Sequence, residues 1–138
     1  MPIDLDRFVA AQSATYEDAL AELRASRKRS HWMWFVFPQL RGLGRSETSR
    51  HFGVDGLVEA QAYLEHPVLG PRLREAFATI VQATGDAQDI LGPIDGLKLR
   101  SSATLFARAA PDDPLFPAVL DRFFDGAPDP ATDELLRH

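Results

Sequence analysis

Apolar residues recur at spacings of three and four along most of this chain, and that spacing favours helices over strands. The cleanest stripes run from about Pro67 to Thr84 and from about Leu115 to Asp125. Gly85 and Gly126 follow them as natural helix stops. A half-buried strand would alternate apolar and polar residues, and outside one aromatic run no segment of useful length does so. We therefore expect an all-α fold.

Weaker helical stripes account for much of the remaining chain. Helices or helical turns are expected at Asp4–Gln12, Thr15–Leu23, Ser46–His51, Leu57–Leu64, Asp86–Leu91, Asp95–Arg108 and Thr132–Arg137, with Ser46 as the N-cap of the third. A chain of 138 residues is long enough to bury one hydrophobic core. We expect a compact array of about six to eight helices. Residues 1–138 should form a single globular helical domain.

The aromatic run from Trp32 to Phe37 is ambiguous because six apolar residues in a row fit a buried strand or a buried helix. A lone strand would leave its backbone groups unpaired. Ser30 is a suitable N-cap for a helix that begins just before the run. These two points favour a helix.

Composition excludes several kinds of chemistry. The chain has no cysteine, which rules out disulfides, thiolate metal ligands and cysteine nucleophiles and fits a reducing compartment. The four histidines lack the spacing of zinc ligands, so we expect no metal and no cofactor. The acidic N-terminus is unlike a signal peptide, and no apolar run approaches the roughly 20 residues that span a bilayer. We expect a soluble cytoplasmic protein without membrane contact.

A cluster of cations stands directly before the aromatic run and is the first candidate site. Its charged residues are Arg27, Lys28 and Arg29, in a chain with a net charge of −5. A helix beginning at Ser30 would place them beside backbone N–H groups that favour anions. The candidate ligand contacts are Arg27, Lys28, Arg29, His31, Trp32, Trp34 and Gln39, with the tryptophans as stacking surfaces and His31 as a candidate acid or base. The alternative is that the aromatics are core and the cations a solvated turn.

A second candidate cluster lies on the expected helix Asp95–Arg108. Lys98, Ser101 and Ser102 are spaced three and four residues apart, so a cation and two hydroxyl donors can converge on one anionic group, with Arg100 adding charge. An exposed helix face with ordinary local hydrogen bonds explains the same residues. The loop with Gly42 and Gly44 resembles phosphate-binding loops only loosely, and a structural turn is the simpler interpretation.

Several of these strings together resemble a known family. They are the stretch from Arg27 to Gln39 with its His-Trp-Met-Trp string, the sequence His66-Pro67-Val68-Leu69-Gly70, and the Lys-Leu-Arg-Ser-Ser string that begins at Lys98. The chain closely resembles the bacterial domain-of-unknown-function family 1810 from about Phe8 to Leu136. The resemblance implies a multihelical fold like that of a mycobacterial conserved hypothetical protein, and it implies no activity. The name calpastatin, sometimes attached to the family, does not fit, because calpastatin is disordered.

These observations lead to one functional hypothesis and one alternative. The first is a small protein that binds an anionic, phosphorylated or nucleotide-like small molecule between the His31–Gln39 segment and the Lys98–Ser102 helix; whether it then catalyses a reaction is left open. The alternative is a regulatory module that docks on an acidic protein through its basic turn. Nucleic acid is a poor candidate partner because the sequence pI is about 5.3. The sequence does not specify an oligomeric state.

Overall fold

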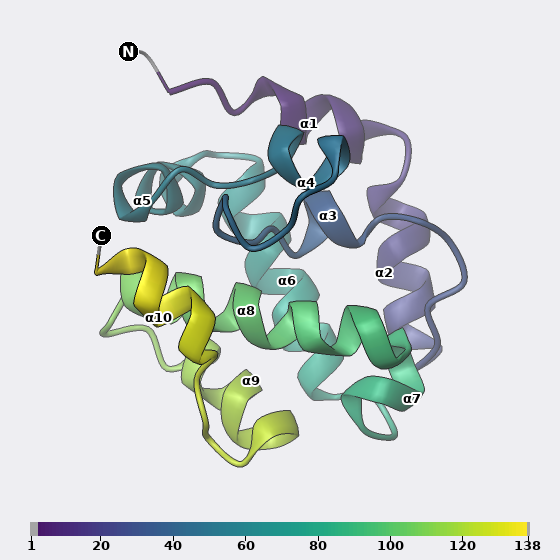
Figure 1. Cartoon of the computed structure of the whole chain (residues 1–138). Helices are drawn as coiled ribbons and strands as arrows, with labels where there is room; N and C mark the ends of the chain where they lie inside the picture. The colour runs from purple at the N-terminus through teal and green to yellow at the C-terminus, as the bar shows by residue number, and fades with distance from the viewer. Residues whose placement is uncertain (1–2, 138) are drawn as a thin grey trace.

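A computed structural model describes residues 3–137, and helices make up most of that range (Figure 1). Their bounds are α1 Asp6–Ser13, α2 Tyr16–Arg24, α3 Met33–Val36, α4 Glu47–His51, α5 Leu57–Glu65, α6 Leu69–Val81, α7 Ala87–Leu91, α8 Pro93–Ala109, α9 Leu115–Phe124 and α10 Pro130–Leu136. The described residues contain no strand, which confirms the all-α prediction. None of the described helices combines the length and apolar character needed to cross a lipid bilayer.

The described residues contain ten helices, more than the expected six to eight. The excess consists of short helices, among them α3 with four residues and α4 and α7 with five. Two of these have strong local caps. Ser46 accepts a hydrogen bond from the Ser49 N–H, as the sequence predicts, and Asp86 and Asp89 form a reciprocal capping box. Such caps stabilise the short helical turns that the sequence predicts at Ser46–His51 and Asp86–Leu91.

Helix α8 lies at the centre of the core and packs against α5, α7 and α9 (Figure 1). Its residues from Ser101 to Ala107 are all buried, so this stretch is enclosed on every side. Aromatic rings fill the space beside it. Phe106 contacts Tyr63 and Phe116 at ring-centroid distances of 5.5 and 5.9 Å, and Phe116 meets Phe77 edge-on at 5.5 Å. Such contacts add to the burial of apolar area.

Helix α6 ends at Val81, four residues before the glycine that the sequence indicates as its stop. Gly85 does adopt the expected positive φ, of 101°. The intervening backbone leaves the helix because the Thr84 N–H donates to the Ser26 hydroxyl, 58 residues away in the chain, at 2.8 Å. A distant hydrogen bond of this kind has no local sequence signal.

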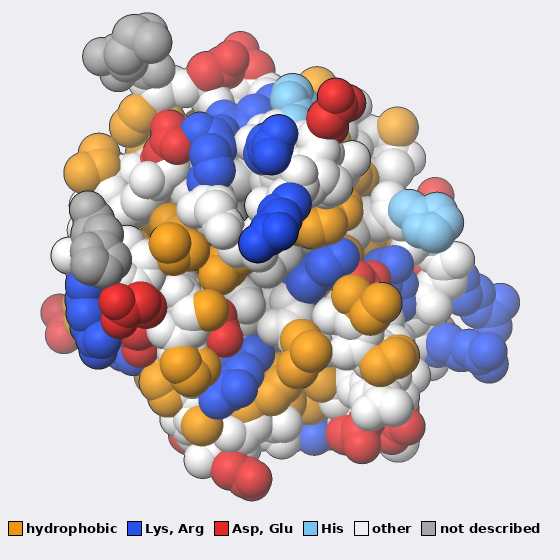
Figure 2. Space-filling model, in the orientation of Figure 1, with side chains coloured by type: hydrophobic (Ala, Val, Ile, Leu, Met, Phe, Trp, Pro, Cys, Tyr) orange, Lys and Arg blue, Asp and Glu red, His pale blue; other side chains and the backbone are white. Residues whose placement is uncertain are grey.

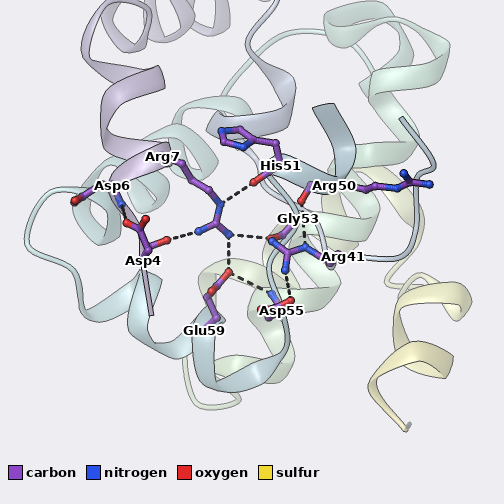
Figure 3. A network of polar contacts seen from close by, with 9 residues as sticks. All are labelled: Asp4, Asp6, Arg7, Arg41, Arg50, His51, Gly53, Asp55 and Glu59. Atoms are coloured by element: carbon purple, nitrogen blue, oxygen red, sulfur yellow. Dashed lines mark hydrogen bonds and ion pairs between the residues drawn. The ribbon is translucent and has the colours of Figure 1, made fainter. Parts of the chain in front are cut away.

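The loop between α3 and α5 is held by backbone pairing and by two arginines (Figure 3). A single parallel bridge joins Leu40 to Val54. Arg7 and Arg41 both donate to the Gly53 carbonyl, at 2.9 and 3.0 Å. Their remaining partners include the His51 and Arg50 carbonyls, Glu59 and Asp55. Arg7 uses four of its five N–H donors inside the protein and Arg41 uses three, so we assign these arginines a structural role.

Candidate functional site

An open groove of about 310 Å³ lies where the loop after α3 faces α8 and the start of α10. Its polar and aromatic lining residues are Trp34, Gln39, Lys98, Ser101 and Asp129, and we call it the Trp34 groove. On the face drawn in Figure 2, basic side chains gather over the region where Figure 1 has α4 and the loop before it. The exposed arginines of that region are Arg41, Arg45 and Arg50.

Lys98 and Trp34 form the cationic side of this groove. The Lys98 ammonium nitrogen lies 3.9 Å from the centroid of the Trp34 ring, within the range of a cation–π contact. The same nitrogen is 3.1 Å from an oxygen of Asp95, whose other oxygen is 3.0 Å from Lys28. The predicted meeting of the two sequence clusters is thus confirmed for Trp34 and Lys98. An ammonium has three N–H groups, so Lys98 retains a donor for a ligand.

Gln39 provides the clearest unused polar group in the groove. The residue is only 9% exposed, yet its side-chain amide has no hydrogen-bond partner among the described residues. Its position is fixed by the backbone, because its carbonyl accepts from the Val54 N–H at 2.9 Å. Its amide atoms are not among the buried side-chain atoms that lack a partner, so they reach the solvent in the groove. An amide that lines a groove and lacks a protein partner is available to a ligand as both donor and acceptor.

The α10 side of the groove carries acceptors. The Ser101 hydroxyl is placed to donate to Oδ2 of Asp129, at 3.1 Å, or to the Leu97 carbonyl, at 3.4 Å. Asp129 Oδ2 also accepts from the Thr132 hydroxyl and backbone N–H, at 2.6 and 3.1 Å. Oδ1 takes no hydrogen bond from any described residue. Ser101 was expected to donate to an anion, but its single proton is already used within the protein.

Gly44 lets the loop pass close to its neighbours at the edge of the groove. A Cβ atom added there would lie 2.7 Å from both side-chain atoms of Ser49 and 3.6 Å from the Trp34 ring. This glycine therefore serves close packing, in agreement with the interpretation of the Gly42–Gly44 loop as structural. The next residue, Arg45, is exposed and forms no ion pair with any described residue.

Two residues expected to contact a ligand are buried instead. Trp32 is 1% exposed, and its indole N–H donates to Glu22 at 3.0 Å, so neither ring face is open for stacking. Ser102 is fully buried inside α8, and its hydroxyl is the single buried side-chain oxygen without a partner among the described residues. Helix spacing alone would place Ser102 on the same face as Lys98, but Ser102 lies where α8 enters the core and is covered there.

The predicted helix start at Ser30 is wrong. Glu22 accepts hydrogen bonds from the backbone N–H groups of Arg29 and Ser30, at 2.6 and 2.9 Å, and from the Ser30 hydroxyl. Burial by itself raises the pKa of Glu22, but these bonds together with that from Trp32 lower it to about 2. The chain becomes helical only at Met33. The basic cluster therefore does not adjoin a helix N-terminus.

The other predicted ligand contacts lie outside the groove lining. Arg27, Arg29 and His31 are exposed on the segment that Glu22 organises. Lys28 pairs with Asp95, and its nitrogen lies 5.3 Å from the Trp32 ring centroid. Arg100 donates from Nε to the Ala127 carbonyl at 3.0 Å and thereby holds the segment before α10.

Two other hollows contain none of the predicted site residues. One of about 400 Å³ lies between α2 and α6, where its polar residues include Arg24 and Gln82. The other, of about 230 Å³, is bounded by α7, the start of α8, Phe123 and Phe124. Within the described part of the chain, no three His, Asp or Glu side chains lie close enough together to hold a metal ion.

Sequence reasoning missed Asp129 altogether. This residue stands 28 positions after Ser101, in a stretch of Ala and Pro that gives no sign of a groove. Its one local signal is Asp-Pro, which is typical of an N-cap followed by the first helical residue, and α10 does begin at Pro130. Leu97 and Ile94, which line the groove on the α8 side, are exposed apolar residues without a distinguishing pattern.

Comparison with known proteins bears on the identity of this fold. The structure matches the crystal structure of the conserved hypothetical protein Rv1873 from Mycobacterium tuberculosis with a TM-score of 0.97 and 51% sequence identity. The match covers 100% of this chain and 99% of that one. No curated protein sequence matches the chain. The family described as "Protein of unknown function (DUF1810)" matches residues 2–136, nearly the whole chain, and the protein therefore belongs to the DUF1810 family.

Proposed function

We propose that the Trp34 groove binds an anionic small molecule that is phosphorylated or nucleotide-like. The observation that carries this proposal is Gln39, a residue 9% exposed whose amide lines the groove without a partner among the described residues. A ligand that pairs with this solvent-accessible amide exchanges its hydrogen bonds with solvent for hydrogen bonds within the groove. The amide can donate and accept at once, as a nucleobase edge requires.

The charge distribution supports an anion at the Trp34 side. The Lys98 ammonium is held in place by Asp95 and by the Trp34 ring, so little side-chain entropy remains to be lost when a ligand binds. Arg45, next to groove residue Gly44, offers a second cation without a partner among the described residues. The volume of about 310 Å³ suits a small ligand.

The test is isothermal titration calorimetry of the purified protein with inorganic phosphate, nucleoside monophosphates and sugar phosphates. Binding of at least one phosphorylated compound is expected, with Gln39→Leu and Lys98→Met each weakening it about tenfold or more. Gln61→Leu is the matched control, because Gln61 is exposed and lies outside the groove. No heat from any compound at millimolar concentration would disprove the proposal. Unchanged binding by Gln39→Leu would place the ligand elsewhere.

A second candidate function rests on the exposed arginines Arg27 and Arg29, with the exposed His31 beside them. Arg27, Arg29 and His31 protrude without ion pairs to described residues, on a segment made rigid by Glu22. A preorganised cationic surface suits an acidic protein partner. Under this alternative, the double change Arg27→Ala and Arg29→Ala abolishes salt-sensitive binding of a polyglutamate peptide, and Arg24→Ala, also exposed, leaves it intact. A wild-type protein that does not bind the peptide removes this candidate.

A further inference from the structure

The two sides of the Trp34 groove differ in the hydrogen bonds that they offer. Lys98, on the side of the Trp34 ring, can only donate. Ser101 lies about one helical turn further along α8 than Lys98, and it contacts Asp129, the N-cap residue of α10. The Ser101 proton is directed at Asp129 or Leu97, so towards a ligand the Ser101 oxygen can only accept. Asp129 Oδ1, a carboxyl oxygen that can accept, has no donor among the described residues.

We infer that the ligand carries a sugar, or a similar vicinal polyol, whose hydroxyl groups donate to Asp129 and Ser101 while its anionic group faces Lys98. This inference rests on the proposed function and names the class of ligand for the same groove. A molecule that is anionic throughout does not fit, because Asp129 would repel its second end. The side chains of Ser101 and Asp129 contact each other, so their two acceptor oxygens are close enough to accept from two adjacent hydroxyl groups of one sugar.

The surroundings of Asp129 favour hydroxyl donors over an ammonium group. Oδ2 of Asp129 accepts three hydrogen bonds, which partly neutralise the carboxylate and fix the orientation of its plane. Oδ1 is then the one oxygen left to accept from a ligand, in a fixed direction. The Trp34 ring and the Leu97 side chain give the groove apolar walls, against which the C–H faces of a sugar ring can pack. The volume of about 310 Å³ fits one sugar phosphate better than a dinucleotide.

The experiment compares three monophosphates by calorimetry: ribose 5-phosphate, butyl phosphate and phosphoethanolamine. The first adds hydroxyls to the phosphate, the second only an apolar chain, and the third an ammonium. We expect ribose 5-phosphate to bind at least about tenfold more tightly than either of the others. Asp129→Asn should abolish this preference, so that ribose 5-phosphate no longer binds more tightly than butyl phosphate. The asparagine retains the N-cap of α10, so the variant should still fold, and a thermal melt checks this.

Asp133→Asn is the matched control, because Asp133 lies on the same helix and pairs with Arg108 outside the groove lining. It should retain the full preference for ribose 5-phosphate. Equal binding of ribose 5-phosphate and butyl phosphate would overturn the sugar inference while leaving the proposed function intact. If phosphoethanolamine binds most tightly of the three, the ligand carries an amine in place of a sugar, and the sugar inference is overturned. Failure of all three monophosphates to bind would overturn the inference, and the wider panel described above would then decide the proposed function separately.

Discussion

Lys98 lies over the ring of Trp34, with its ammonium nitrogen 3.9 Å from the ring centroid, and at the same time pairs with Asp95. Lys98→Met retains most of the aliphatic stem and removes the charge. Asp95 still pairs with Lys28 in this variant, so only the cation–π contact and one ion pair are lost. We expect the free energy of unfolding to fall by roughly 0.5–2 kcal/mol. Urea denaturation measures this loss. Lys98→Arg should lose less than Lys98→Met, and equal losses would mean that the charge contributes nothing.

Two hydroxyls buried in α8 should respond in opposite directions to removal. The Ser102 hydroxyl has no partner among the described residues. Ser102→Ala should therefore leave the free energy of unfolding unchanged or raise it, by about 1–3 kcal/mol if the whole cost of the unpaired hydroxyl is recovered. Thr104 is equally buried, but its hydroxyl donates to the Arg100 carbonyl and accepts from the Asp129 N–H, each at 2.8 Å. Thr104→Val should therefore destabilise by roughly 1–3 kcal/mol. Chemical melts test both variants, and a large loss for Ser102→Ala would reveal a hidden partner.

The carboxylate of Glu22 should make stability depend on pH in the acid range. Its pKa is lowered from the ordinary 4.5 to about 2 in the folded protein. A carboxyl group whose pKa is lowered by folding stabilises the fold at pH values above its pKa in the unfolded chain. For Glu22 this contribution disappears as the pH falls from about 4.5 towards 2. Urea melts across this range should show a steeper loss for the wild type than for Glu22→Gln. Glu65→Gln, at an exposed position on α5, is the control and should follow the wild type.

Gly44→Ala should strain the wall of the groove, because the new methyl group would lie 2.7 Å from the Ser49 side chain. We expect a loss of roughly 1–3 kcal/mol, as for other overpacked sites. The double variant Gly44→Ala with Ser49→Gly removes the clashing atoms. In a double-mutant cycle the two changes should therefore be less harmful together than the sum of their single effects. Strict additivity would contradict the steric explanation.

The parts of the fold that could be predicted are those set by nearby residues. The stripes that form α6 and α9 and the Ser46 cap depend on contacts within a few positions, and each was expected from the sequence. The end of α6 and the start of α3 were misplaced. Both are decided by hydrogen bonds to residues distant in the chain, Ser26 in the first case and Glu22 in the second.

The candidate site could be predicted only in part for the same reason. The sequence correctly indicated that the segment with Trp34 meets the helix with Lys98. Composition did not reveal which tryptophan is open, since Trp32 and Trp34 are two residues apart and only the three-dimensional packing distinguishes them. Nor did it reveal that Ser101 is an acceptor towards the groove, because that depends on Asp129.

The single parallel bridge between Leu40 and Val54 has a consequence for how long the groove keeps its shape. The Arg41 and Val54 N–H groups each donate across this bridge, at 2.7 and 2.9 Å. Deuterium can replace their protons only when the bridge separates, so their exchange rates record how often the loop that positions Gln39 comes away. A bound molecule that pairs with Gln39 would slow hydrogen exchange at the Arg41 and Val54 N–H groups while leaving exchange at the end of α2 unchanged.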